Sequence, residues 1–139
     1  MKTFITSLLG MFVVFCAFAQ EEQEEAVVPG PAITFEELVY DFGDITQGDV
    51  VEHIFKFDNT GDAPLIITDV QRTCGCTAPS WPREPVMPGM TKELTVRFNS
   101  AGKMGRQIKV ITVVSNAVGS KNQVKIVTNV LPKKEEEIK

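Results

Sequence analysis

Residues 91–99 read Thr-Lys-Glu-Leu-Thr-Val-Arg-Phe-Asn, and this stretch decides the fold class of the 139-residue chain. Leu94, Val96 and Phe98 alternate with polar residues along it. Because successive side chains of a β-strand point to opposite faces, one face of this strand is apolar and the other is polar. The alternation predicts a strand with one buried face and one face in water.

Similar short runs, rich in Val, Ile, Phe and Thr, recur about every ten residues between clusters of Gly, Asn, Asp and Pro. No stretch keeps a helical period of 3.6 residues. We expect strands at 33–38, 50–58, 64–71, 91–99, 107–115 and 123–131, with short pieces at 40–45 and around Cys76. Residues 78–88 carry four prolines and predict a loop with little ladder bonding. The pattern predicts an all-β, immunoglobulin-like β-sandwich of about seven strands.

The first nineteen residues have the features of a signal peptide. Lys2 supplies a positive charge, residues 4–18 are apolar and uncharged, and Ala17 and Ala19 place small residues at the −3 and −1 positions. The apolar run is about 15 residues long, whereas a membrane span needs roughly 20. We therefore expect cleavage before Gln20, export to the periplasm or the extracellular space, and no transmembrane segment in the mature chain.

Lipoprotein processing at Cys16 is the alternative to ordinary cleavage. It requires a small residue just before the cysteine, and Phe15 occupies that position. We therefore do not expect a lipid anchor at Cys16.

Both ends of the mature chain have the composition of solvated segments. Residues 20–31 form an acidic linker that ends in Pro-Gly-Pro, and residues 132–139 form a charged tail. Such segments have too little apolar surface to offset the entropy of ordering them. The predicted domain therefore spans residues 32–131, as a single unit.

Charge and histidine content exclude several function classes. The chain has a formal net charge of −4 and no basic stripe, so we expect no nucleic-acid partner. The single histidine, His53, alternates with Phe55 and Phe57, which predicts a packed side chain and no catalytic role. Asp41 and Asp44 flank a turn and are a weak calcium signal. We expect no catalytic residue, no metal site and no cofactor.

Cys74 and Cys76 are the one group of residues in the sequence that could form a disulfide, bind a soft metal ion or exchange thiols. Residues i and i+2 of a strand share a face with Cα atoms roughly 6.5 Å apart, near the upper limit for a disulfide, and Gly75 can bend to close the gap. A disulfide or a buried thiol pair is the leading hypothesis. A Cu(I) or Zn(II) site, helped by Met87, Met90 and Met104, and a thiol-exchange site stay open.

Trp81 is the only tryptophan and lies in the proline-rich stretch. It is a candidate contact for a protein partner, or a lid over one end of the sandwich, and we favour the lid.

Four short motifs carry a resemblance to a known family. They are Tyr-Asp-Phe-Gly-Asp-Ile at 40–45, Phe-Lys-Phe-Asp-Asn-Thr-Gly at 55–61, Cys-Gly-Cys-Thr at 74–77, and the pairs Pro-Gly at 88–89 and Phe-Asn at 98–99. Over residues 33–131 the chain resembles the bacterial family catalogued as domain of unknown function 1573 (DUF1573), related to hydin-like and major-sperm-protein-like domains. The resemblance implies an immunoglobulin-like sandwich on an exported bacterial protein, and it implies no activity.

The function predicted from these observations is that of an exported, non-enzymatic module that binds protein or has a structural role in the cell envelope. Its expected partner is another envelope or secreted protein. The alternative is a thiol-based copper, zinc or redox protein that uses Cys74 and Cys76.

Overall fold

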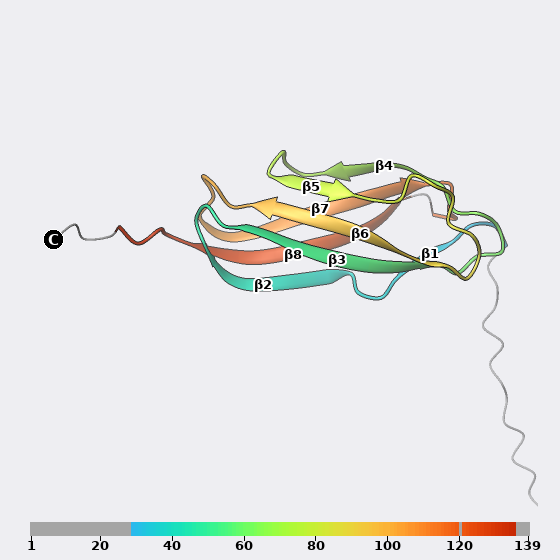
Figure 1. Ribbon diagram of the computed structural model, residues 1–139, viewed down its shortest axis with the longest axis horizontal. Helices are drawn as coiled ribbons and strands as arrows, with labels where there is room; N and C mark the ends of the chain where they lie inside the picture. Colours follow the sequence, from blue (N-terminus) through green and yellow to red (C-terminus); the bar gives the residue numbers. More distant parts are fainter. Residues whose placement is uncertain (1–28, 120, 136–139) are drawn as a thin grey trace, which may run out of the picture.

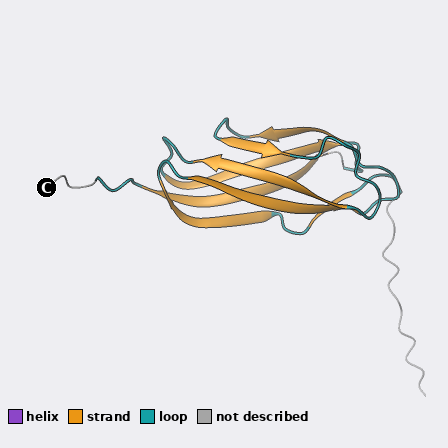
Figure 2. Cartoon of the chain, viewed as in Figure 1, coloured by secondary structure: helices purple, strands orange, loops and turns teal. Residues whose placement is uncertain are grey.

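The computed structural model describes residues 29–119 and 121–135. The predicted signal peptide, the cleavage point, Cys16, residues 20–28 of the linker and residues 136–139 of the tail lie outside those ranges. The described residues contain no helix (Figure 2). No described segment is a helix of the length and hydropathy that crossing a membrane requires. The eight strands are β1 (Ile33–Phe35), β2 (Val39–Thr46), β3 (Val50–Asn59), β4 (Ile67–Arg72), β5 (Thr77–Ser80), β6 (Thr91–Asn99), β7 (Gly105–Ser115) and β8 (Lys121–Leu131).

The strands form two four-stranded sheets that pack face to face (Figure 1). Sheet I has the order β1-β3-β6-β5, and sheet II has the order β2-β8-β7-β4. All neighbours are antiparallel except β2 and β8, which run parallel. The predicted immunoglobulin-like sandwich is confirmed.

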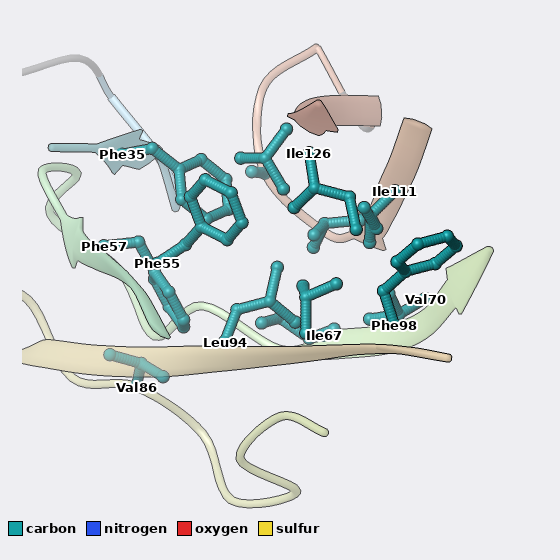
Figure 3. Packing of buried hydrophobic residues seen from close by; sticks show 14 of the residues in the cluster. Phe35, Phe55, Phe57, Ile67, Val70, Val86, Leu94, Phe98, Ile111 and Ile126 are labelled. Carbon is teal, nitrogen blue, oxygen red and sulfur yellow. The ribbon is translucent and has the colours of Figure 1, made fainter. Parts of the chain in front are cut away.

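The core lies between the sheets and follows the predicted alternation (Figure 3). Leu94, Val96 and Phe98 of β6 are fully buried, and Phe55 and Phe57 of β3 lie beside them. Sheet II contributes the facing side chains Val70, Ile111, Val113, Val124, Ile126 and Val130. Burying one such side chain contributes about 1.5–3 kcal/mol, so this cluster is the main source of stability.

Several strand boundaries differ from the predicted ones by two or three residues: β4 begins three residues later, and β7 and β8 each begin two residues earlier. β1 ends at Phe35, because the chain leaves sheet I after Glu36 and begins the β2 strand of sheet II at Val39. β5 forms inside the proline-rich stretch predicted to be a loop. Pro79 fits there because β5 is an edge strand and the missing N–H falls on its free side.

The last residues of the expected linker pack onto the domain. The Gly30 nitrogen donates to Asp62 Oδ1, and the Val118 nitrogen donates to the Pro31 oxygen at 3.0 Å. A Cβ atom on Gly61 would lie 1.9 Å from the Gly30 oxygen, so only glycine fits there. Gly30 and Pro31 therefore belong to the packed domain, two residues before its predicted start.

Candidate functional site

The turn between β4 and β5 carries the two cysteines. The sulfur atoms of Cys74 and Cys76 lie in direct contact, in the arrangement of a disulfide, and the Cα atoms are 5.3 Å apart. Gly75 between them is exposed, while both cysteines are half-buried. The close approach that the sequence hypothesis requires is therefore present.

Cys76 is held more firmly than Cys74. The Cys76 carbonyl oxygen accepts a hydrogen bond from the Asn99 nitrogen at 2.9 Å, and the Cys76 side chain packs against the core cluster. Cys74 is held through its own carbonyl, which accepts from the Thr77 nitrogen at 3.3 Å. The turn lies on the same side of the sandwich as the β6–β7 turn and the C-terminal end (Figure 1).

Thr77 completes this group, which we call the cysteine turn: Cys74, Gly75, Cys76 and Thr77. Only 1% of Thr77 is exposed, and its Oγ1 atom lies 3.9 Å from both sulfur atoms. A buried hydroxyl group normally has a hydrogen-bond partner, and the two sulfur atoms are the polar contacts that this one makes in the structure. The cysteine turn thus places an O–H donor within reach of either sulfur.

A cationic side chain lies near this end of the core. The Lys109 ammonium lies 5.9 Å from the ring centroid of Phe98, which is the strand partner of Thr77. Burial, and next the charge of Lys103, lower the pKa of Lys109.

The methionines do not gather around the cysteines as the copper hypothesis supposed. Met87 and Met90 lie in the turn before β6, where the Asn59 nitrogen donates to the Met90 oxygen. Cys76 is bonded to Asn99, at the far end of β6. Nine residues of strand separate Met90 from Asn99, or roughly 30 Å. Met104 alone lies at the same end as the cysteine turn.

His53 occupies a packed aromatic position between the sheets. Its ring stacks on Tyr40 with centroids 3.5 Å apart and contacts Phe55 edge-on, and its Nε2 atom hydrogen-bonds Glu37 Oε1. Within residues 29–119 and 121–135, no group of three or more His, Cys, Asp and Glu side chains is arranged to hold a metal ion.

The acidic pair weighed for calcium has hydrogen-bond partners in the protein. Asp41 Oδ1 accepts from the Gly43 nitrogen at 2.8 Å, where it supports a β-bulge, and Asp44 Oδ1 accepts from Asn129 Nδ2 at 2.8 Å.

Trp81 follows β5 and packs partly buried against the core. The Arg83 guanidinium lies 3.9 Å above the ring centroid of Trp81 and covers its outer side. The Trp81 Nε1 atom is buried and makes no hydrogen bond in the described structure. The ring also borders a shallow groove of about 690 Å³ on sheet I, with Glu36, Lys56, Glu93 and Thr95 among its lining residues.

Sequence reasoning did not single out two features of the structure. One is the Thr77 hydroxyl group: the motif at 74–77 marks the residue, but only the strand pairing shows that Thr77 points inward toward both sulfurs. The other is the part of β3 before Lys56, which has no hydrogen bond to β1 because β1 pairs only with residues 57–59. No local signal marks this part of β3, since it depends on how far β1 extends.

Comparison with solved structures supports the fold. A protein of unknown function from Porphyromonas gingivalis W83 has a TM-score of 0.63 at 15% identity, over 79% of this chain and 51% of that one. The secreted serine protease VesC from Vibrio cholerae has a TM-score of 0.58 at 12% identity, over 75% of this chain and 24% of that one. The ASH/PapD-like domain of human CEP192 (PapD-like domain 7) has a TM-score of 0.60 at 8% identity, over 73% of this chain and 87% of that one.

The chain spans about half the length, or less, of the first two of these proteins. At such low identity the likeness shows a shared sandwich fold and nothing about activity. None of the curated protein sequences is detectably similar to this chain.

The family model described as "Protein of unknown function (DUF1573)" matches residues 33–130, which is almost the whole sandwich. This chain therefore belongs to the DUF1573 family.

Proposed function

We propose that the protein is an exported, non-catalytic module that binds an extended segment of another envelope or secreted protein along one sheet edge. The observation that carries the proposal is the shortness of β1, which pairs only with residues 57–59 of β3. Glu36 adds one bond, from its nitrogen to the Lys56 oxygen. Residues 50–55 of β3, which we call the open edge, are hydrogen-bonded to no strand on that side within the described structure, although the ring of Tyr40 in β2 stacks on His53.

The hydrogen-bond pattern of β3 shows which backbone groups are free. The Asn59 nitrogen donates to Met90 and the Ser100 nitrogen donates to the Asp49 oxygen, so the odd-numbered residues of β3 face β6. The N–H and C=O groups of Glu52 and Ile54 therefore point away from sheet I. Unpaired groups repeated at every second residue are a template for one more strand.

The other three sheet edges are interrupted by a proline, a bulge or a register shift. On β5, Pro79 lacks an N–H and the Thr77 nitrogen is bonded to the Cys74 oxygen. On β2, a bulge interrupts the edge beside Asp41. On β4, a register shift follows Ile67. Bulges and prolines are the usual means of blocking an edge, so the open edge of β3 stands apart.

The side chains beside the open edge define the chemistry of the occupant. Val50 and Ile54 are 51% and 43% exposed and offer apolar, β-branched contacts. Glu52 lies between them, exposed and 3.7 Å from the Arg97 guanidinium, and the exposed Glu36 flanks the near end. An extended segment that alternates apolar side chains with Lys or Arg would match this surface in shape and charge.

Photo-cross-linking in the native host tests the proposal. A photo-reactive amino acid in place of Glu52 is expected to capture one protein, at a segment with that alternation. The same probe in place of Ile108, which is 55% exposed on β7, is the matched control and should not capture it. With the partner segment as a synthetic peptide, the backbone amides of Glu52 and Ile54 should gain protection from hydrogen exchange.

Ile54→Pro sharpens the test. The Ile54 N–H has no partner strand, so proline costs the fold little there, while its ring blocks an added strand. Loss of the cross-link with a retained melting temperature supports the proposal. Equal capture from position 108, unchanged amide exchange, or capture of a second copy of this chain would each overturn it.

The metal alternative has less support. Zinc would need ligands beyond the two sulfurs, and Met87 and Met90, which the copper hypothesis added to the pair, lie at the far end of β6. The redox alternative is a separate question, because the cysteine turn has features that a passive crosslink does not need.

A further inference from the structure

The cysteine turn is a poor structural crosslink. The chain-entropy gain from a disulfide grows with the length of the loop that it closes, and here that loop contains only Gly75. The two sheets are held together by the buried cluster and not by the cysteines. A bond between Cys74 and Cys76 therefore adds little to stability, and its presence needs another reason.

The surroundings suit the reduced pair better than the oxidised one. A thiolate is a strong hydrogen-bond acceptor, whereas a disulfide sulfur is a weak one. Thr77 Oγ1 is buried and lies 3.9 Å from both sulfurs, so a thiolate formed at either position gains a donor that is already in place. The Lys109 ammonium near Phe98 adds positive charge at the same end.

We propose that Cys74 and Cys76 form a reversible thiol–disulfide exchange site that reacts with a dithiol-bearing protein, and that Thr77 is its positioning residue. The site is independent of the open edge of β3, so either proposal stands if the other fails.

The exchange proceeds in two balanced steps. One thiol of the partner loses its proton to solvent and attacks Cys74 Sγ, the sulfur of the less firmly held residue. The bond between the two cysteine sulfurs breaks, a mixed disulfide forms, and Cys76 leaves as a thiolate facing Thr77 Oγ1. The second partner thiol, also deprotonated, attacks the partner's own sulfur in the mixed disulfide and releases Cys74 as a thiolate. The cysteine pair thereby gains two electrons and takes up protons from solvent, which received the protons of the partner thiols, and the partner dithiol becomes a disulfide.

The experiment uses the purified chain and dithiothreitol as the dithiol probe. Under native conditions we expect full reduction by millimolar dithiothreitol, read by alkylation and intact mass, with a melting temperature lower by less than about 5 °C. In the reduced protein, Thr77→Val should slow alkylation at pH 7 by about twofold to tenfold, because losing one hydrogen bond raises the thiol pKa.

Thr128→Val is the matched control. Thr128 is as buried as Thr77, but its Oγ1 atom donates to the Gly43 oxygen at 2.8 Å, away from the cysteines. This variant should lower the melting temperature without changing the alkylation rate. A pair that resists native-state reduction, or equal alkylation rates in the Thr77 and Thr128 variants, would overturn the proposal.

Discussion

At the scale of single residues, the side chain of Asn59 holds together the loops at the end of the sandwich opposite the cysteine turn. It is fully buried, and its Nδ2 atom donates to the Ala63 oxygen at 2.7 Å and the Val86 oxygen at 2.8 Å. Its Oδ1 atom accepts from the Gly61 nitrogen at 3.0 Å and the Ala32 nitrogen at 3.3 Å. One side chain thus joins three separate loops, which explains the Asn-Thr-Gly motif in structural terms.

Asn59→Ala should be strongly destabilising. The substitution removes the partner of the Ala63 oxygen and of the Gly61 and Ala32 N–H groups, at a cost of about 3 kcal/mol or more. The Val86 oxygen loses one of its two donors and keeps the Leu65 N–H. Urea unfolding of the purified domain measures this free energy. Asn99→Ala is the control: Asn99 is exposed and its Oδ1 atom bonds the Ala101 nitrogen, so we expect a loss below about 1 kcal/mol. Equal losses in the two variants would contradict this account of Asn59.

At the scale of strands, β5 shows how one residue keeps a sheet edge from pairing. Because the Cys76 carbonyl faces β6, the even-numbered residues of β5 bond to β6 and the odd-numbered ones face outward. Thr77 uses its outward N–H on Cys74, and Pro79 has none. The edge therefore offers no free N–H at either outward position.

Pro79→Val should open this edge. Valine suits a strand and restores an outward N–H, so we expect concentration-dependent self-association with little change in melting temperature. Sedimentation velocity at several concentrations measures the association. Pro82→Val, three residues along and beyond the end of β5, is the control and should stay at the parental association state. Association of both variants to the same extent would show that the edge is not the cause.

The positions of the strands could be predicted from the sequence, whereas the way in which they pair could not. Residues 91–99 form β6 over the predicted range, because alternation is a local property of the chain. A short strand around Cys76 is predicted, but its extension through Pro79 to Ser80 falls in the predicted loop, because a proline fits in a strand mainly at an edge and edge position depends on the whole sheet. The open edge and the inward direction of Thr77 also depend on the pairing of the whole sheet, so the sequence does not predict them. The closeness of Cys74 and Cys76 was foreseeable, since i and i+2 share a face.

At the scale of the whole molecule, the second strand and the last strand are neighbours in sheet II. β2 pairs in parallel with β8 and has no other strand partner, although about 80 residues of sequence lie between them. β8 also pairs with β7 over its full length, so it occupies a central position in sheet II. Sheet II therefore cannot assemble until the last strand is available, and folding of this non-local topology is expected to be slow.

A chain that stops at residue 119 should for this reason remain unfolded. It lacks Val124, Ile126, Val127 and Val130, which are all buried and together contribute about 6–12 kcal/mol. A domain of this size has a total stability of only about 5–15 kcal/mol, so what remains does not hold the sandwich together. Far-UV circular dichroism and urea titration of chains 20–119 and 20–132 make the comparison, with cooperative unfolding expected of the longer one alone. A cooperative transition in the shorter chain would mean that β1 to β7 form a stable unit without their central partner. If it stays unfolded, the domain can fold only after its C-terminal strand has been made, which suits a chain whose first nineteen residues predict export through a membrane before folding.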